Sequence, residues 1–482
     1  MKHSLVQLDH LPDEILLIIL KKLDNDQVLY SLMGVNKRLN TFVYDSIFTS
    51  HLTLMRCSSN DSISPLSDTI LDRFYLQILP TIHHKIQWLN VESSSMERIL
   101  LSANYPNLYG LGLYNLEIET AKDLFTNGNV VIDLFKNKIL SLIIRMKKNK
   151  NQTFTKYKNI LIFTHVFTVF TNLQYLSFGS SSICPQRISF DMSSRIFMSS
   201  TLLELHVNVL HFSDCLYLLD GRFNQLRILH VNIGWIHHSS SPTIDNTENL
   251  PNLKCFSLYC DVDTSFYDEL IVPLLHRMLN LENLHLYLIV CQRTFIDGNN
   301  LKRNILNHMP QLNKFTFNIH SSIRLHNQIN LLSNEDIQYT FNGFQNNQII
   351  SCVDYFSKVQ RGQCHIYSYP YEWKEYHKIT NNFPGGIFKY IREISLFDER
   401  PFEHEFFFQI SQSFPFMKKL DVINKKPQKD KQSRNLDHNQ HLSIIEYPHL
   451  SQLGDGKVST GKKSTERRAR KEEHRKDERK ER

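Results

Sequence analysis

The sequence of 482 residues lacks the segments that would place a protein in or across a membrane. Residues 1–7 contain no apolar core ahead of the polar pair Asp9 and His10, so no secretory signal is predicted. The longest apolar stretch, residues 160–170, is interrupted by His165 and two threonines and is too short to span a bilayer. We therefore expect an intracellular protein, in the cytoplasm, the nucleus or both.

A disulfide framework is also lacking. The eight cysteines are scattered from Cys57 to Cys364 without paired spacing, which favours free thiols in a reducing compartment. Cys255 and Cys260 have no second pair that would complete a tetrahedral metal site. The cysteines therefore predict neither disulfide bonds nor a zinc site.

The body of the chain carries little net charge. Residues 454–482 hold twelve Lys or Arg and seven Asp or Glu, so this tail accounts for +5 of the formal +7. The nearly neutral remainder provides no electrostatic footprint for nucleic acid. The tail has too few apolar residues to form a core and is expected to be disordered. Nucleic-acid binding through residues 457–482 is an alternative that the interspersed acidic residues weaken.

Catalytic motifs are missing as well. Residues 456–463 approach a phosphate-binding loop, but Lys463 stands where Ser or Thr must follow the lysine. His404 and Glu405 have no second histidine at zinc-protease spacing, and no nucleophile elbow occurs. We therefore expect no catalytic residues, no cofactor and no enzymatic activity.

The most informative segment that is present opens the chain. Pro12 suits the first position of a helix, and Asp13 with Glu14 near its start and two lysines near its end follow the helix dipole. Residues 15–20 are all apolar and cover every side of that helix. A unit of roughly fifty residues cannot cover so much apolar surface. Part of this helix is therefore expected to contact another protein.

Two further helices are expected, one capped by Asp24 or Asn25 and one over about 35–48. Periodicity alone also fits an ordinary three-helix core. The pattern Leu11-Pro12-x-Glu14-Ile15-Leu16-x-x-Ile19-Leu20-x-x-Leu23, followed by Val35-Asn36-Lys37-Arg38, resembles the F-box over residues 5–54. The resemblance implies a helical module that docks on the Skp-type adaptor of a cullin-RING ubiquitin ligase. By motif position it implies adaptor contacts from Leu11, Pro12, Ile15, Leu16, Ile19, Leu23, Leu32 and Val35.

The middle of the chain repeats a polar residue followed by Leu-x-x-Leu-x-Leu, with apolar substitutes. Clear copies begin at Asn107, Asn172, Gln225, Asn252, Asn280 and Gln311, and the last four start 27, 28 and 31 residues apart. This spacing resembles leucine-rich repeats, which implies parallel strands on the concave face of a horseshoe and helices outside. Outer helices are expected over 267–279, 301–309 and 404–414. The Asn or Cys that this family places beyond each core is replaced, so we expect irregular repeats without that side-chain ladder.

The predicted fold class is therefore α/β. A three-helix F-box over residues 5–54 is followed by an irregular leucine-rich-repeat-like solenoid over 80–424, in which 331–390 break the rhythm as an inserted recognition element or an aromatic-rich irregular repeat. Residues 425–482 form a polar linker, an incomplete repeat begun at 447–453, and the basic tail. The unfinished repeat leaves the array uncapped, and we expect that a truncation or altered reading frame removed a cap.

Residues that alternate with the core leucines are expected to face the concavity. They place His206, His230 and His285 in a central lane, with Tyr114, Tyr259, Tyr287, Asn208, Asn232 and Asn318 beside it. A polar lane with aromatic anchors is a candidate target-binding surface, although exposed strand positions are also polar in proteins without such a role. Because the three histidines come from different repeats, no metal site is predicted.

These features lead to one functional hypothesis and one alternative. The hypothesis is a substrate-receptor subunit of a Skp–cullin–F-box ubiquitin ligase, in which the F-box binds the adaptor and the repeat array binds a target protein. The alternative is a non-catalytic repeat scaffold with a vestigial F-box, since Gln27, Val28 and Leu39 depart from the residues usual in that family.

Overall fold

The computed structural model describes residues 11–58, 62–125, 129–147, 152–180, 187–190, 197–238, 249–325, 331–344, 348–424, 426–428 and 445–455. The near-phosphate-loop at 456–463, the basic tail and most of the polar linker lie outside the described residues. The chain divides into two compact units, and each is described by itself. Unit 1 comprises Met1–Ile289 with Arg303–Phe315, and unit 2 comprises Val290–Lys302 with Thr316–Arg482.

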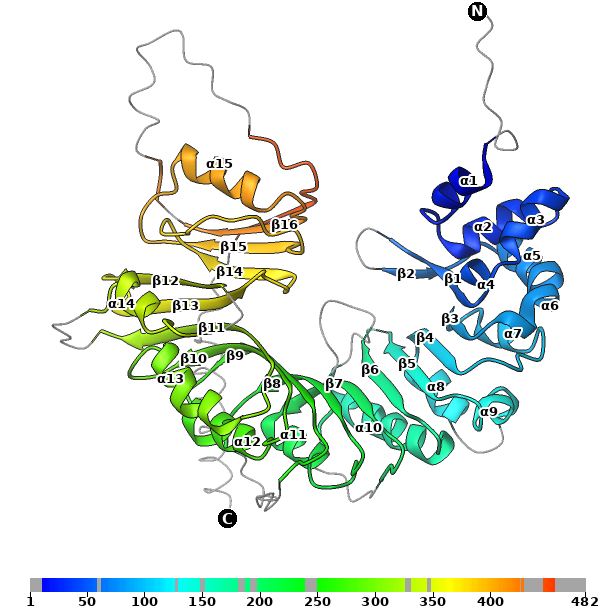
Figure 1. Ribbon diagram of the computed structural model, residues 1–482, viewed down its shortest axis with the longest axis horizontal. Coiled ribbons are helices and arrows are strands. Elements are labelled where there is room, and N and C mark those ends of the chain that lie inside the picture. Colours follow the sequence, from blue (N-terminus) through cyan, green and yellow to red (C-terminus); the bar gives the residue numbers. More distant parts are fainter. Residues whose placement is uncertain are drawn as a thin grey trace, which may run out of the picture. The chain divides into compact units, whose positions relative to one another are not determined.

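Unit 1 opens with the expected helices (Figure 1). They are α1 (Asp13–Leu20), α2 (Asn25–Leu32), α3 (Lys37–Val43) and α4 (Ser46–Thr49). Pro12 caps α1 and is not its first helical residue. The third predicted helix is divided in two, because the Asp45 carboxylate accepts a hydrogen bond from the Ile47 amide and caps a new helix. Val28 and Leu29 of α2 are fully buried at the centre of this helical module.

A long sheet follows, in which β1 lies between β2 and β3, and each later strand lies beside the one before it. Its order is β2-β1-β3-β4-β5-β6-β7-β8-β9-β10, parallel from β1 to β9 except for the antiparallel pair β1 and β2. The strands are β1 (His51–Cys57), β2 (Ile63–Pro65), β3 (Trp88–Glu92), β4 (Gly110–Leu116), β5 (Ser141–Met146), β6 (Tyr175–Ser180), β7 (Glu204–His211), β8 (Ile228–Trp235), β9 (Cys255–Thr264) and β10 (Asn283–Cys291).

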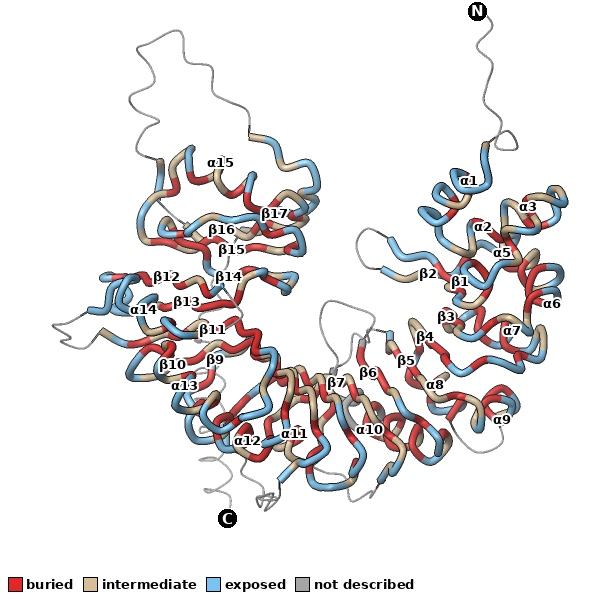
Figure 2. Tube along the Cα trace, in the orientation of Figure 1, coloured by how far each residue is buried: buried red, intermediate tan, exposed pale blue. Residues whose placement is uncertain are grey.

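Helices cover one face of this sheet (Figures 1 and 2), and its buried side chains are mostly apolar. The pairing register aligns one fully buried residue from each strand into a column, which runs Leu52, Leu89, Leu111, Leu142, Leu176, Leu205, Leu229 and Phe256. The helices are α5 (Asp68–Arg73), α6 (Leu79–Ile82), α7 (Met96–Leu100), α8 (Ile118–Phe125), α9 (Val130–Phe135), α10 (Gln152–Val169), α11 (Phe212–Leu218) and α12 (Val272–His276). The alternating residues are left on the opposite face.

The polar residue that leads several of the repeats has a structural role. The Asn107, Asn252 and Asn280 amides donate to the carbonyl oxygens of His84, Asn224 and Pro251, over 2.5, 2.7 and 3.0 Å. The Thr201 hydroxyl likewise donates to the Leu173 carbonyl. Each bond reaches back to the preceding strand–helix segment. Among the described residues, these side chains therefore join neighbouring repeats from the position just before the repeated core.

Unit 2 contains an antiparallel group of strands and a parallel sheet. In the first group β13 (Arg361–Tyr369) lies between β11 (Lys314–Arg324) and β12 (Gln348–Phe356). The parallel sheet has the order β14 (Glu375–Ile379), β15 (Glu393–Phe397), β16 (Lys419–Ile423) and β17 (Gln452–Asp455). Helices α13 (Gly298–Asn304), α14 (Asn334–Tyr339) and α15 (His404–Ser413) occur along this part of the chain. The interruption expected at 331–390 is thus centred on an antiparallel hairpin.

Aromatic side chains form the core of the parallel sheet in unit 2, among them Tyr371, Tyr376, Phe388 and Phe414. The incomplete repeat at 447–453 supplies Leu453 of β17, which pairs with Leu420 of β16. Within the described residues every cysteine is a free thiol. No helix in that part of the chain is both long and apolar enough to cross a bilayer.

Candidate functional site

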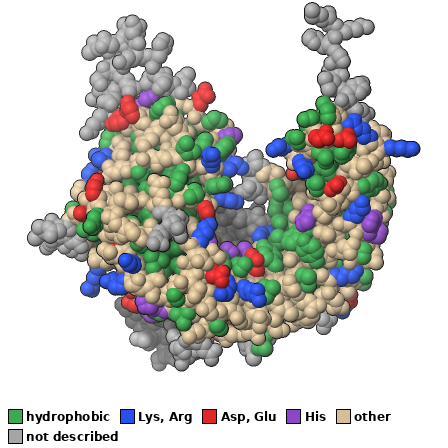
Figure 3. Space-filling model, viewed as in Figure 1, with side chains coloured by type: hydrophobic (Ala, Val, Ile, Leu, Met, Phe, Trp, Pro, Cys, Tyr) green, Lys and Arg blue, Asp and Glu red, His purple; other side chains and the backbone are tan. Residues whose placement is uncertain are grey.

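An apolar surface lies on the outside of the N-terminal helical module. Its side chains are between 40% and 58% exposed, and we call this set the docking face: Ile15, Ile18, Ile19, Leu23 and Val35. Figure 3 shows hydrophobic side chains at the surface around α1, beside acidic and basic ones. Isolated exposed apolar residues are ordinary, but a contiguous group marks a protein-interaction surface.

The docking face is held in place by the residues beneath and beside it. Leu16 and Leu20 of the same helix are buried and fix which side of α1 faces outward. The Arg38 guanidinium on α3 donates to the Leu11 carbonyl and to the Asp13 carboxylate, both over 2.5 Å. Arg38 therefore ties the start of α1 to α3.

The structure separates the predicted adaptor contacts into three groups. Ile15, Ile19, Leu23 and Val35 belong to the docking face, and Pro12 is exposed beside it. Leu11 and Leu32 are half-buried. Leu16 is fully buried in the chain's own core, so its prediction as a contact residue is corrected. Ile18 is 57% exposed and belongs to the docking face but was not among the predicted contacts, because an unbroken apolar run does not reveal which of its members face outward.

The helical module is joined directly to the sheet. The Asn25 amide of α2 donates to the carbonyls of Ile47 and His51, over 3.1 and 2.9 Å. The residue after α4 leads into β1, which pairs in parallel with β3 from His51 opposite Trp88 onward. Lys85 also donates to the Tyr44 carbonyl over 2.7 Å. The module and the sheet therefore form one packed body within unit 1.

A polar pocket of about 310 Å³ lies on the sheet face opposite the helices. Its polar lining comes from β5 to β9, namely Arg145, Ser177, His206, Asn208, His230, Asn232, Ser257 and Tyr259. Figure 3 shows histidine side chains beside charged ones over the middle strands of unit 1. The pocket has space because Gly179 contributes no side chain, and a Cβ there would lie 3.0 Å from the Asn208 amide nitrogen.

Arg145 supplies the positive charge of the polar pocket. Its guanidinium donates to the Ser177 carbonyl over 3.1 Å and to the Ser177 hydroxyl over 2.9 Å, so it lies across β5 and β6. Burial lowers the pKa of Arg145, while the nearby Tyr114 and Tyr175 oppose that shift. A partly buried guanidinium beside amide and hydroxyl groups suits the recognition of acidic or carbonyl-rich protein segments.

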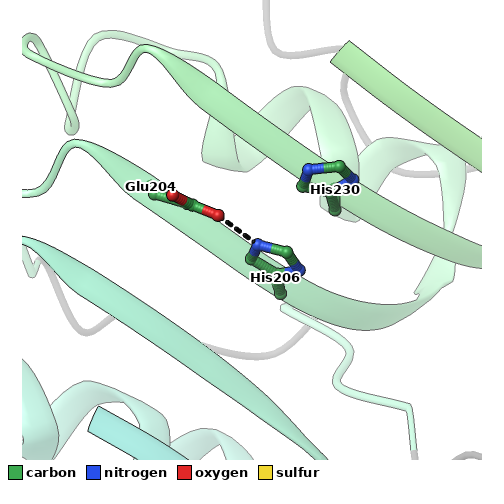
Figure 4. A group of neighbouring side chains, drawn as sticks. All are labelled: Glu204, His206 and His230. Carbon is green, nitrogen blue, oxygen red and sulfur yellow. Dashed lines mark hydrogen bonds and ion pairs between the residues drawn. The ribbon is translucent and has the colours of Figure 1, made fainter. Parts of the chain in front are cut away.

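Two of the predicted histidines lie next to one another. His206 and His230 are register partners on β7 and β8, with ring centroids 4.2 Å apart and ring planes 23° from parallel. Nε2 of His206 is 2.6 Å from the Glu204 carboxylate (Figure 4). Burial, and after it His206 and His285, lower the pKa of His230 to about 4. The imidazole of His230 is therefore neutral at pH 7.

The remaining predicted target-binding residues differ in whether they line the polar pocket, lie beside it or are buried. Tyr259 lines the polar pocket and stacks on Tyr287 at 4.4 Å, but Tyr287 is only 1% exposed. Tyr287 therefore supports Tyr259 and is corrected as a contact residue. Tyr114 lies beside Arg145, and His285 is close enough to His230 to affect its pKa. Asn318 is fully buried in unit 2 and is also corrected.

Sequence reasoning missed Arg145 and Glu204. Arg145 follows the core residue Ile144 by one position, as Asn208 follows Val207, so the weak repeat at Ile139 contained the signal. Glu204 stands two residues before His206 on the same strand, and residues at that spacing share a face. Arg145 could have been found by extending the lane to the weak repeat, and Glu204 by extending it along the strand that carries His206.

Unit 1 therefore presents two candidate interaction surfaces, a helical module with an apolar face and a sheet with a polar pocket. Residues 8–59 match the family model described as the F-box domain. The chain therefore contains an F-box domain at its N-terminal helical module. F-box domains generally bind the Skp-type subunit of cullin-RING ubiquitin ligases and act as non-catalytic adaptors. A comparison with curated proteins gives no significant match.

Proposed function

We propose that this protein is the substrate-receptor subunit of a Skp–cullin–F-box ubiquitin ligase, binding the Skp-type adaptor through the docking face and a target protein through the polar face of unit 1. The observation that carries the proposal is the docking face itself, which lies inside the matched F-box segment. In this role the chain contributes proximity between target and ligase, and the other subunits supply the chemistry.

The docking face can contribute measurably to the affinity of a complex. Full burial of a Leu or Ile side chain contributes roughly 1.5–3 kcal/mol, so covering a half-exposed one contributes about 1 kcal/mol. The docking face of five such side chains then contributes about 5 kcal/mol, which corresponds to more than a thousandfold in affinity. Placing an aspartate in the covered interface adds the cost of desolvating a charge.

The double variant Ile15→Asp with Ile19→Asp tests adaptor binding. We expect at least a hundredfold loss of affinity for the purified Skp-type adaptor, measured by calorimetry or co-purification of the full chain. The matched control is Val130→Asp with Leu134→Asp, which alters two exposed apolar residues at the same spacing on α9. Equal affinity of both variants and the wild type would reject the docking face.

The target-binding part of the proposal is tested at the polar pocket. Gly179→Leu fills the space beside Asn208 and Arg145 without altering the buried leucine column. We expect it to retain adaptor binding and to lose proteins that the wild type captures under proteasome inhibition. The α9 control variant should retain both. If Gly179→Leu captures the same proteins as the wild type, target binding lies elsewhere on the chain.

A repeat scaffold with a vestigial F-box gives a different pattern in the same experiments. Captured proteins would still depend on Gly179, but no adaptor complex would form at micromolar concentrations. The two functions are therefore separated by the adaptor measurement alone.

A further inference from the structure

Three side chains beside the polar pocket offer metal-binding atoms within a small volume. Glu204 and His206 project from one face of β7, and His230 projects from the neighbouring position on β8 (Figure 4). One ligand atom from each of the three lies within 4.8 Å of the others. Within the described residues, this is the group of three His, Cys, Asp or Glu side chains that meets this spacing.

The donor set matches a known coordination preference. Two imidazole nitrogens and one carboxylate oxygen bind Zn²⁺ at about 2.0–2.2 Å in tetrahedral sites that keep one position for water or another ligand. Ligand atoms on such an ion lie roughly 3–3.5 Å apart, as the bond lengths require. The 2.6 Å distance between the Glu204 carboxylate oxygen and His206 Nε2 must therefore increase slightly, and a ring nitrogen of His230 must move closer to both atoms.

The side chains can make that adjustment. Those of Glu204 and His206 are each about 30% exposed and stand on the open face of the sheet. Rotation about their side-chain bonds therefore leaves the buried leucine column unchanged. Each histidine offers an imidazole nitrogen as a ligand, and Glu204 offers a carboxylate oxygen whose negative charge compensates that of a bound cation. Arg145, in the same pocket, opposes a cation, but its guanidinium is hydrogen-bonded to Ser177.

We propose that Glu204, His206 and His230 bind one divalent transition-metal ion, with Zn²⁺ the best match, and leave one coordination position open. His206 and His230 line the polar pocket, so the open position adjoins the surface that faces a bound protein. Water occupies that position in the isolated protein, and a His, Cys or carboxylate side chain of a ligand can replace it. This metal site does not depend on adaptor docking.

The chain offers a matched control for this site. Glu375 and His377 on β14 have the same two-residue spacing, with Oε2 and Nε2 3.0 Å apart. This second pair belongs to no three-ligand group among the described residues. The His377→Ala variant therefore reports any zinc affinity that a lone Glu–His pair provides.

The test is a competition titration of the full chain with Zn²⁺ against a chromophoric chelator, together with visible spectra of the Co²⁺-loaded protein. We expect His206→Ala, His230→Ala and Glu204→Gln each to weaken one site at least tenfold and to abolish a tetrahedral Co²⁺ spectrum. His377→Ala should change neither.

Thermal unfolding of the full chain reports whether each variant is folded, and Glu204→Gln preserves side-chain shape if an alanine variant fails. Equal Zn²⁺ affinity of the wild type and Glu204→Gln would overturn the proposal. The proposal would also be overturned if His377→Ala lost as much Zn²⁺ affinity as the variants of the three proposed ligands.

Discussion

Lowering the pH from 7 to 5 is expected to destabilise unit 2 through two stacked histidines. His320 and His365 are register partners on β11 and β13, with ring centroids 3.6 Å apart. Burial, and after it His377, lowers the pKa of His365 to about 3. Burial and neighbouring cationic groups, His365 first, also hold the pKa of His320 well below its usual value.

A directional chain of hydrogen bonds fixes the neutral form of His365. The Asn318 amide nitrogen donates to the Tyr371 hydroxyl over 2.5 Å, which leaves the Asn318 oxygen as an acceptor. Nε2 of His365, 2.8 Å away, must then donate to it. Tyr371 in turn donates to the Glu375 carbonyl over 2.7 Å. Protonation of His365 adds a charge among groups that already have their hydrogen bonds.

The sign and magnitude follow from linkage. The folded pKa of His365 lies below the unfolded value of 6.5, so the unfolded state binds more protons between pH 6.5 and about 3. Its stabilising contribution is complete above pH 6.5 and decreases as the pH falls. At pH 5 the loss from His365 is about 2 kcal/mol, and His320 acts in the same direction. Asp354 acts in the opposite direction, because burial raises its pKa.

Hydrogen–deuterium exchange of β11 and β13 measures this effect. Protection factors, corrected for the pH dependence of intrinsic exchange, should fall about thirtyfold from pH 7 to pH 5. The variant His365→Gln keeps an amide donor and cannot titrate, so its decrease should be smaller by about 2 kcal/mol. A wild type whose protection is unchanged at pH 5, or a variant with the same decrease, would refute the reasoning.

Three further predictions concern unit 1. Leu16→Ala should lower the stability of the helical module by about 3 kcal/mol in thermal unfolding, whereas Ile18→Ala should leave stability unchanged and weaken adaptor binding. Arg38→Ala should weaken adaptor binding about tenfold without unfolding the module, because the start of α1 loses its bonds to α3, and surface plasmon resonance would measure it. Asn252→Ala should reduce exchange protection at the start of β9 by about 1 kcal/mol, since the Asn224 carbonyl loses its donor.

The repeated strands could be predicted because their pattern is local. Each Leu-x-x-Leu-x-Leu copy places two apolar residues on one side of a strand, and the register then brings Leu205, Leu229 and Phe256 together. The residues on the outward face could be predicted from the same pattern, so His206 and His230 were found. The short distance between these two histidines could not be predicted, because it requires adjacent strands to align without a shift.

The antiparallel hairpin of β12 and β13 could not be predicted, because its turn is fixed from a distance. The turn contains Lys358, Val359 and Gln360, and Gln360 adopts a φ of 50° that usually favours glycine. The Glu399 carboxylate accepts hydrogen bonds from the Lys358 and Val359 amides at 3.0–3.2 Å. The local sequence does not predict this turn, because the carboxylate that accepts hydrogen bonds from its amides belongs to a residue about forty positions later.

The join between the F-box and the sheet has the clearest functional consequence. The predicted F-box ended at residue 54 and the predicted repeats began at residue 80, so a flexible linker between them was consistent with the sequence. Instead β1 follows the last helix of the module directly and pairs with β3. The Asn25 amide donates to the carbonyls of Ile47 in α4 and His51 in β1, so it links the module to the sheet. The docking face and the polar pocket therefore belong to one packed unit. Under the proposed function, an adaptor bound at the docking face would hold a target bound at the polar pocket in a fixed orientation, and this rigidity would raise the effective concentration of the target at the ligase.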